Sequence, residues 1–285
     1  MSSNKIFISF LLFFLFALPA QAEMIRKSNF KNFRNAQAGS YSVAVVDNST
    51  GKLLFSKRAE DEKPIASITK IIGAYVFLNE KPDLSEKVCM EQKDEVDGGR
   101  LKLPVGSTMK AKDFLYSSLI GSANNSATAL IRLSGLTKND FIDKMNSLAE
   151  DVGAKDANFV DSSGISPDNK ATVKDLALLG RKVFDNNQIR QISGLKKYTF
   201  KYDNGKKKKT VLHTSPIVSN NSSYFKVLSA KTGYLPEVGN NLIVKLQSKK
   251  SSKNQIIVAL MGANTRNTTT QDAIKLGKWA FSNYK

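Results

Sequence analysis

The sequence predicts an α+β fold, in which an antiparallel sheet is flanked by helices and a helical subdomain is inserted. Segments with strand-like patterns lie near both ends of the chain, and the segments between them carry apolar residues at helical spacing. The 285 residues suffice for one large domain with a buried core. We therefore expect one domain over 40–285, with its sheet part at about 40–80 and 195–285 and its helical part at about 81–194.

The first 22 residues have the features of a secretory signal peptide. Lys5 supplies a short positive region, residues 6–18 are apolar, and the small residues Ala20 and Ala22 form a cleavage site. An uncleaved membrane anchor is the alternative, but the apolar run is too short to span a bilayer comfortably. We therefore expect export to the periplasm or another extracytoplasmic part of the envelope, with residues 23–39 as a basic leader.

The composition limits the kinds of partner and cofactor that we expect this protein to bind. The formal net charge is +18. For an exported protein, this charge predicts peripheral contact with an anionic envelope surface rather than with nucleic acid. Cys89 is the single cysteine and cannot form an internal disulfide, and no cluster of residues has the spacing of metal ligands. The sequence therefore predicts no metal site and no cofactor.

The first part of the sheet precedes a serine at the start of a helix. Residues 41–46 and 53–55 have the pattern of two strands joined by a turn. Ser67 then begins an apolar run with helical periodicity that extends to Leu78. Lys70 lies one turn later on the same face, so a hydroxyl and an amine come within reach of each other. A serine nucleophile with a lysine base requires this arrangement.

The Ser-x-x-Lys pattern is weak support by itself. It also begins at seven other serines, Ser107 and Ser223 among them, so chance explains any single instance. Two further motifs downstream distinguish Ser67 from the others.

The middle of the chain is predicted to be helical. Short extended pieces at residues 87–90 and 100–108 surround a Gly-Gly break. Helical spacing of apolar residues then recurs over residues 111–120, 125–133, 138–152 and 172–184. Thr172, followed by Asp175, predicts a capping box at the start of the last of these helices.

Strand patterns return in the last third of the chain, and a helix is predicted over residues 269–281. The strand patterns cover residues 197–202, 210–213, 224–231, 241–247 and 255–261. The lysine run at residues 206–209 is predicted to be a solvated hairpin tip between the first two of these strands.

The second motif is Ser122-Ala123-Asn124, on a loop between two predicted helices. Taken alone, it favours a simpler interpretation in which Ser122 and Asn124 cap the next helix. The third motif, Lys231-Thr232-Gly233, is predicted at the end of a strand. Glycine there would let a bound backbone come close, and a strand end leading into a glycine turn is the simpler alternative.

These three motifs resemble, in kind and order, the signatures of the serine penicillin-recognising enzymes. The segments 64–70, 159–164 and 231–239 further resemble low-molecular-mass penicillin-binding proteins, the family of D-alanyl-D-alanine carboxypeptidases and their endopeptidase relatives. The resemblance covers about residues 41–281 and implies a β-lactamase/transpeptidase-like fold. It also implies a peptidoglycan peptide substrate and covalent inhibition by β-lactams.

The resemblance assigns catalytic roles to three residues. Ser67 would attack the carbonyl of a D-alanine and form an acyl-enzyme, Lys70 would be the base, and Ser122 would relay a proton to the leaving amine. Lys70 can act only when it is neutral, and we expect burial and the charge of Lys231 to lower its pKa.

The remaining motif residues are implied to bind substrate. Asn124 would bind its peptide group, and Lys231 and Thr232 would hold its terminal carboxylate beside Gly233. The backbone N–H groups of Ser67 and Tyr234 would form the oxyanion hole. Arg266 is a further candidate for the carboxylate, although the sequence leaves its register open.

The resulting hypothesis is a serine D-alanyl-D-alanine carboxypeptidase of cell-wall remodelling, with a D,D-endopeptidase as the alternative. A class A β-lactamase is less favoured, because the chain lacks a Glu-x-x-Leu-Asn segment and Ala123 replaces an acid, so slow penicillin turnover is expected. His213 is the only histidine, which disfavours a Ser-His-Asp hydrolase. A non-catalytic peptidoglycan-binding module is the last alternative, disfavoured by the intact Ser67, Lys70 and Lys231.

Overall fold

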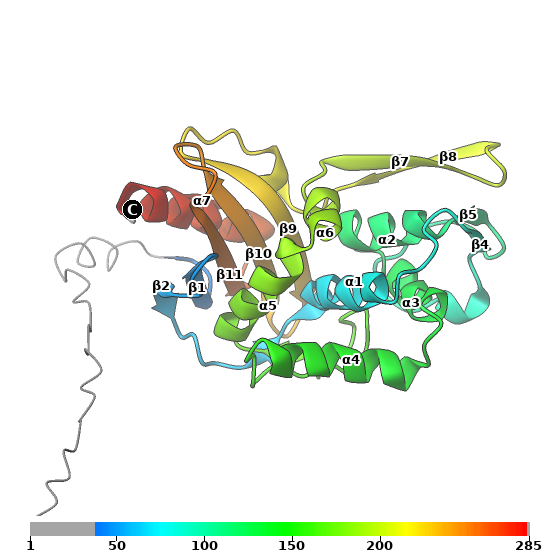
Figure 1. Ribbon diagram of the computed structural model, residues 1–285, viewed down its shortest axis with the longest axis horizontal. Coiled ribbons are helices and arrows are strands. Elements are labelled where there is room, and N and C mark those ends of the chain that lie inside the picture. The colour runs from blue at the N-terminus through cyan, green and yellow to red at the C-terminus, as the bar shows by residue number, and fades with distance from the viewer. Residues whose placement is uncertain (1–37, 284–285) are drawn as a thin grey trace, which may run out of the picture. The chain divides into compact units, whose positions relative to one another are not determined.

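A computed structural model describes residues 38–283, so the predicted signal peptide and nearly all of the predicted leader lie outside the described residues. The main sheet is antiparallel, with strand order β2-β1-β11-β10-β9 (Figure 1). Its strands are β1 (Ser42–Asp47), β2 (Leu53–Lys57), β9 (Phe225–Leu235), β10 (Gly239–Ser248) and β11 (Gln255–Ala263). Because β1 pairs with β11, the early and late strands share one sheet, as the sequence predicted.

Helices cover both faces of this sheet. Helix α5 (Val173–Asp185) packs on β1, β10 and β11 from one side, and α7 (Arg266–Asn283) packs on β10 and β11 from the other (Figure 1). All six residues of β1 are buried. A strand covered on both faces needs apolar residues throughout, which explains the unbroken run at Val43–Val46.

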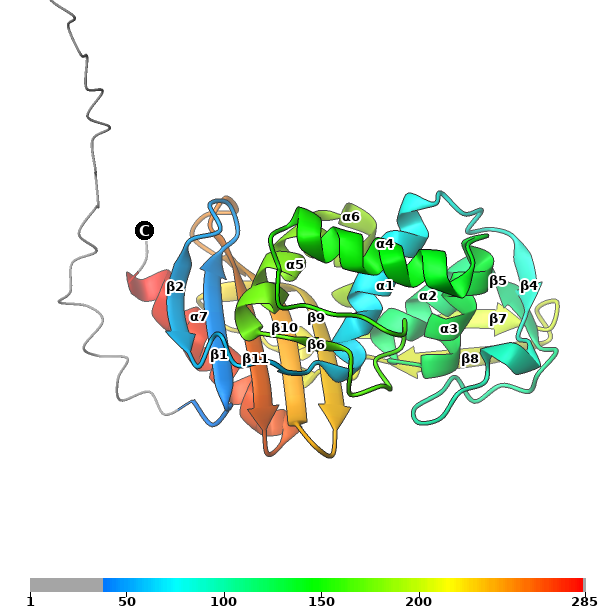
Figure 2. The same ribbon diagram turned by 90° about the horizontal axis from the view of Figure 1, so that it is seen from below.

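The helical part lies beside the β9 edge of the sheet (Figure 2). Its helices are α1 (Thr69–Asn79), α2 (Ala111–Ile120), α3 (Asn124–Leu133), α4 (Lys138–Asp151) and α6 (Asn187–Ser193). Helix α1 lies at the centre of this part and packs against α2, α3, α4 and α6, and also against α5. Its apolar residues therefore face in every direction, as expected of a central helix.

Short elements complete the described residues. The two-stranded pairs are β3 (Lys63–Pro64) with β6 (Lys170–Ala171), β4 (Lys87–Cys89) with β5 (Thr108–Lys110), and β7 (Lys197–Tyr202) with β8 (Lys207–Leu212). The 3₁₀ turns are η2 (Ala66–Ile68), η3 (Gln92–Asp94) and η4 (Pro216–Ser219). No helix within residues 38–283 combines the length and the apolar character needed to cross a membrane.

The predicted capping box at α5 is confirmed. Thr172 Oγ1 accepts a hydrogen bond from the Asp175 N–H at 3.1 Å, and Asp175 Oδ2 accepts one from the Thr172 N–H at 3.2 Å. Such a cap typically contributes about 1 kcal/mol to helix stability. The predicted helices at α2, α3 and α4 are also present, within one residue at each end.

The position predicted for the hairpin of β7 and β8 was wrong. It was expected in the main sheet, but β7 pairs only with β8, and the hairpin packs on α2. Tyr198 contacts the Tyr116 ring, with ring centroids 4.3 Å apart, and donates a 2.6 Å hydrogen bond to Asp113. Strand propensity does not specify a partner, so only this tertiary contact reveals where the hairpin lies.

Two local predictions were also wrong, and one short helix was not predicted. Lys207–Lys209 belong to β8, and the hairpin turn covers residues 203–206, so only Lys206 of the predicted tip lies in it. The extended piece predicted at residues 100–108 contributes only its last residue to β5. Helix α6 was not predicted, because its seven residues are too few to show helical periodicity.

Candidate active site

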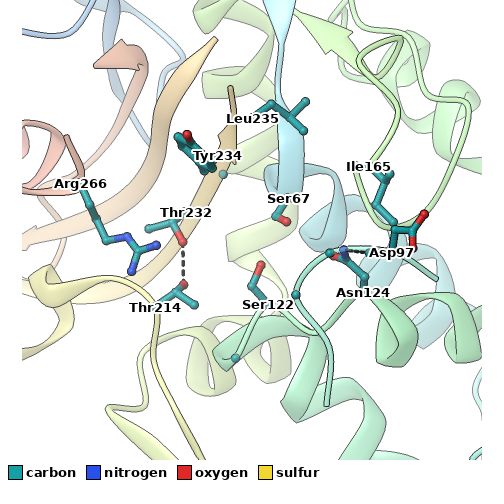
Figure 3. Close-up of a pocket in the computed structure, with 15 residues that line it drawn as sticks. Ser67, Asp97, Ser122, Asn124, Ile165, Thr214, Thr232, Tyr234, Leu235 and Arg266 are labelled. Atoms are coloured by element: carbon teal, nitrogen blue, oxygen red, sulfur yellow. Dashed lines mark hydrogen bonds between the residues drawn. The ribbon is translucent and has the colours of Figure 1, made fainter. Parts of the chain in front are cut away.

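The three sequence motifs come together in a cleft between β9 and the helical part (Figure 3). The cleft has a volume of about 480 Å³. Residues from each motif line it: Ser67, Ser122, Asn124, Thr232 and Gly233. Tyr234 and Arg266 line it as well. Segments separated by more than 100 residues of sequence therefore meet around one hydroxyl.

Ser67 lies in the 3₁₀ turn η2, which leads directly into α1. The sequence predicted this position at the start of the helix, and the prediction is confirmed. The preceding residue, Ala66, has φ of +53°, in the left-handed region that non-glycine residues rarely adopt. Backbone strain of this kind costs about 1–3 kcal/mol and is characteristic of functional sites. Ser67, the next residue, lines the cleft.

Lys70 is buried, with 1% of its surface exposed, and its amine makes three hydrogen bonds. Nζ donates to Ser67 Oγ at 2.8 Å, to Asn124 Oδ1 at 2.7 Å and to the Ser163 carbonyl. Burial lowers the pKa of Lys70 to about 7, while the nearby Asp161 carboxylate raises it. The sequence attributed part of this lowering to Lys231, but burial is the cause in the structure.

Ser122 and Asn124 do not cap helix α3, so the simpler interpretation of their motif is wrong. The N-cap of α3 is Ala123, and no side chain caps it. Ser122 has φ of +59°, and its Oγ accepts a 2.7 Å hydrogen bond from Lys231 Nζ. Asn124 links Lys70 to the Asp97 carbonyl, to which its Nδ2 donates at 2.7 Å.

Lys231 and Thr232 lie inside β9 rather than at its end, because the strand continues to Leu235. Lys231 is fully buried and donates to Ser122 Oγ and to the Thr232 carbonyl. Burial lowers its pKa well below the ordinary lysine value, and the charges of Lys70 and Arg266 lower it further.

Gly233 is needed for packing within the chain. A Cβ atom there would lie 2.5 Å from the Ile65 carbonyl oxygen and 3.3 Å from the Ser67 nitrogen. The sequence expected this space to admit a bound backbone, but the η2 turn approaches it instead. The glycine thereby allows the strand with Lys231 to lie directly against the turn with Ser67.

The mouth of the cleft contains the remaining predicted residues. The Tyr234 side chain is 57% exposed. Arg266 is the first residue of α7, which begins three residues earlier than predicted, and its side chain lines the cleft. Thr232 Oγ1 lies 2.6 Å from Thr214 Oγ1, near Arg266 (Figure 3).

Sequence reasoning missed the structural role of Asp161. Its carboxylate accepts hydrogen bonds from the backbone N–H groups of Ser163 and Gly164, both at 2.6 Å, and of Ser166 at 2.9 Å. These bonds shape the loop whose Ser163 carbonyl contacts Lys70. In the sequence this loop segment shows only the family resemblance, and the spacing of its polar residues gives no sign of this function.

Sequence reasoning also missed Thr214 and Asp97 as cleft residues. Neither belongs to a motif, and both reach the site through loops whose paths the sequence does not specify. The only signal near Asp97 was the Gly-Gly break that follows it.

His213 is a structural residue. Its Nδ1 accepts a 2.9 Å hydrogen bond from the Ser215 N–H, and its Nε2 lies 3.1 Å from the Ser193 carbonyl oxygen. Burial and the charge of Lys231 lower the pKa of His213 to about 4. Within residues 38–283, no group of three or more His, Cys, Asp or Glu side chains is arranged to hold a metal ion.

Comparisons with known proteins agree with this geometry. Residues 29–265 match the family model described as D-alanyl-D-alanine carboxypeptidase. The D-alanyl-D-alanine endopeptidase of Haemophilus influenzae is 32% identical over 226 residues, which span 79% of this chain and 75% of that protein. The endopeptidase of Pseudomonas aeruginosa is 28% identical over 85% of this chain and 77% of its own length.

A solved structure shares the fold. The crystal structure of a Streptomyces DD-transpeptidase superposes with a TM-score of 0.77 at 23% identity, and the match covers 86% of this chain and 97% of that one. At this level of identity the likeness shows the fold, an α+β architecture with an antiparallel sheet, and the fold alone.

Proposed function

The chain belongs to the D-alanyl-D-alanine carboxypeptidase family of serine peptidases, which modify peptidoglycan, and from that premise we propose how its residues cleave the substrate. Ser67 attacks the carbonyl carbon of a D-alanine in a stem peptide and forms an acyl-enzyme, which water then releases. The observation that supports this assignment is the contact of Lys70 Nζ with Ser67 Oγ at 2.8 Å.

The two other hydrogen-bond partners of the Lys70 amine suit it to act as the base, because both are acceptors. The Asn124 and Ser163 oxygens are carbonyl acceptors and cannot donate a hydrogen bond. A neutral amine keeps two N–H groups for these acceptors, so its lone pair faces the one partner that can donate, the Ser67 hydroxyl. With a pKa of about 7, Lys70 is neutral in a large fraction of molecules at neutral pH.

Ser122 returns the proton to the leaving amine. Its hydroxyl accepts from the Lys231 amine, which orients it in the cleft beside Ser67 (Figure 3). As the leaving nitrogen takes the Ser122 proton, the proton that Lys70 took from Ser67 replaces it, so that both lysines end the acylation step in the protonation state in which they began it.

Charge in the transition state is stabilised by backbone groups. The N–H groups of Ser67 and Tyr234 form the oxyanion hole in this proposal, and one such donor is typically worth about 3 kcal/mol. The close approach of β9 to η2 at Gly233 supports it, because it brings the two segments together. Thr232 and Arg266 hold the carboxylate of the leaving group.

Crosslinks between stem peptides are the preferred substrate in this proposal, and terminal D-alanine is the second. A terminal D-alanine and a crosslinking diamino acid with a free carboxyl both carry a carboxylate next to the scissile amide, so Thr232 and Arg266 suit either leaving group. The two relatives from Haemophilus influenzae and Pseudomonas aeruginosa are endopeptidases by name, which favours crosslinks.

Digestion of purified muropeptides tests the choice. Crosslinked dimers and pentapeptide monomers are incubated side by side with the enzyme, and we expect faster cleavage of the dimers. Faster release of D-alanine from monomers would reverse the order. Ser67→Ala must abolish both reactions, whereas Ser223→Ala, a change in an exposed Ser-x-x-Lys, must leave both intact.

Penicillin separates the remaining alternatives. Stable labelling by a fluorescent penicillin, lost in Ser67→Ala, is expected of a DD-peptidase. Rapid penicillin hydrolysis would favour a β-lactamase, and no labelling of the folded protein would favour a non-catalytic wall-binding module.

Export and peripheral contact with an anionic envelope surface also belong to the proposal, supported by the amino-terminal sequence pattern and the net charge of +18.

A further inference from the structure

The cleft carries opposite charges at its two ends. Arg266 lies at one end and Asp97 at the other, with Ser67 between them (Figure 3). Among the described residues that line the cleft, Asp97 is the only one with a carboxylate. A substrate bound along the cleft therefore meets a cationic group on one side of the reacting carbonyl and an anionic group on the other.

The backbone at Asp97 is held in place by the same asparagine that contacts the catalytic base. Asn124 Nδ2 donates to the Asp97 carbonyl at 2.7 Å, and the Asn124 N–H donates to the Gly99 carbonyl at 2.7 Å. Gly98, between them, has φ of +84°, and a Cβ there would lie 2.8 Å from Asn124 Nδ2. These contacts use the Asp97 backbone and leave its exposed carboxylate available to a ligand.

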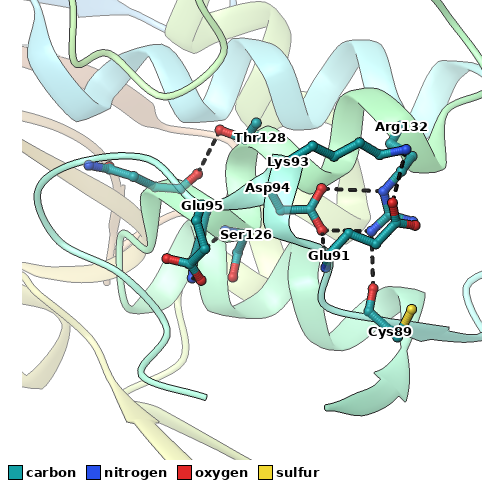
Figure 4. Close-up of polar contacts among 10 residues, drawn as sticks. Cys89, Glu91, Lys93, Asp94, Glu95, Ser126, Thr128 and Arg132 are labelled. Atoms are coloured by element: carbon teal, nitrogen blue, oxygen red, sulfur yellow. Dashed lines mark hydrogen bonds and ion pairs between the residues drawn. The ribbon is translucent and has the colours of Figure 1, made fainter. Parts of the chain in front are cut away.

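The loop that carries Asp97 is also fixed at both ends to helix α3. Before Asp97, Arg132 forms ion pairs with Asp94 at 2.7 Å and with Glu91 at 3.0 Å (Figure 4). After it, the Leu101 N–H donates to Asn125 Oδ1 at 2.9 Å. A carboxylate on a loop anchored in this way has a defined position before substrate arrives, which reduces the entropy lost on binding.

We propose that Asp97 forms a subsite for a free ammonium group on the residue that precedes the acylated D-alanine. The inference rests on the proposed function, in which Arg266 and Thr232 take the carboxylate of the leaving group. The acyl part of the peptide then extends from Ser67 toward Asn124 and Asp97. The substrate class is therefore stem peptides whose third residue is a diamino acid with its side-chain amine unreacted.

Acetylation of that amine provides the test. A dimer crosslinked through the acceptor's amine retains one free side-chain amine, on the strand that acylates the enzyme. The kcat/KM of cleavage is measured for such dimers before and after acetylation, and in parallel for pentapeptide monomers. An exposed ion pair contributes up to about 1 kcal/mol, so we expect wild type to prefer the free amine about five-fold.

Three variants locate the effect. Asp97→Asn should cleave both forms at the rate that wild type shows for the acetylated form, and Asp97→Lys should prefer the acetylated form. Asp143→Asn removes an exposed carboxylate on α4 and should keep the wild-type preference. The melting temperature of Asp97→Asn is compared with that of wild type to show that the variant is folded.

Equal cleavage of free and acetylated peptides by wild type, or an unchanged preference in Asp97→Asn, would overturn the subsite and leave the proposed function standing. If the dimers are not cleaved, the kcat/KM values for free and acetylated pentapeptide monomers are compared in the same way. Failure of wild type to cleave any of these peptides would overturn the proposed function and the subsite together.

Discussion

Lys231 Nζ donates a 2.7 Å hydrogen bond to Ser122 Oγ, although the two residues are separated by 109 positions in the sequence. The contact joins the edge strand of the sheet to the loop between α2 and α3. It therefore fixes the two sides of the cleft relative to each other, with Ser67 between them (Figure 3).

Replacement of Lys231 by methionine should separate activity from stability. We expect the rate constant of penicillin acylation to fall at least about a hundredfold, because Ser122 loses the amine that orients its hydroxyl. Thermal stability should stay equal or rise, because a buried amine with a strongly lowered pKa is replaced by an apolar chain of similar size. The matched control is Lys226→Met, at an exposed position on the same strand, and a comparable loss of acylation there would contradict the assignment.

Acylation should depend on pH through Lys70. Its amine must be neutral to accept the Ser67 proton, and burial lowers its pKa to about 7. We therefore expect the rate constant of penicillin acylation to rise with pH through a midpoint near 7. Stopped-flow measurements between about pH 5 and pH 9 check this, and a flat profile would rule out Lys70 as the base.

The same lowered pKa also affects stability. The unfolded chain binds more protons than the folded one between about pH 7 and the ordinary lysine pKa, so stability rises with pH across that window. Lys70→Met should flatten this part of the melting temperature profile and abolish acylation. Lys70→Arg should abolish acylation at every pH, because the guanidinium stays protonated.

Asp161→Asn should destabilise the loop that contacts Lys70 and lower the pKa of Lys70. Burial raises the pKa of Asp161, but hydrogen bonds from Ser166, Ser163 and Asn169 outweigh it and the pKa is lowered. The carboxylate thus stabilises the fold above its unfolded pKa, and this stability is lost as pH falls through the lower folded value. An amide can accept at only one of its two positions, so we expect a loss of about 1–3 kcal/mol at neutral pH, measured by urea unfolding.

The acylation profile of Asp161→Asn provides a second readout. Because the Asp161 charge raises the pKa of Lys70, its removal should move the midpoint of the profile to lower pH. A variant that is destabilised but keeps the wild-type midpoint would show that Asp161 acts only through the loop backbone.

Gly233→Ala should destabilise the junction between the sheet and the η2 turn that carries Ser67. The new Cβ would lie 2.5 Å from the Ile65 carbonyl oxygen, and a backbone atom cannot move away as a flexible side chain can. We expect a loss of about 1–3 kcal/mol in unfolding free energy together with slower acylation. At Gly99 the nearest neighbour is 3.9 Å away, so Gly99→Ala should cost much less, and equal losses in the two variants would refute the steric argument.

Local features of this protein could be predicted from its sequence. The three-residue spacing of Ser67 and Lys70, the capping box at Thr172 and the helices of the middle region depend on neighbours within about one helical turn. The placement of the early and late strands in one sheet followed from strand patterns at both ends of the chain, and the structure added that β1 pairs with β11. The order of the three motifs carried the family resemblance.

Contacts between distant segments were decided only by the tertiary structure. Asp161 shapes the loop that contacts Lys70, Gly233 accommodates Ile65, and the β7–β8 hairpin packs on α2 rather than in the sheet. Asp97 enters the cleft because Asn124 binds its backbone carbonyl. Sequence periodicity reports which face of an element is buried, but it does not say which other element covers that face. The partners at such contacts, and the pKa values that burial imposes there, exist only once the chain has packed.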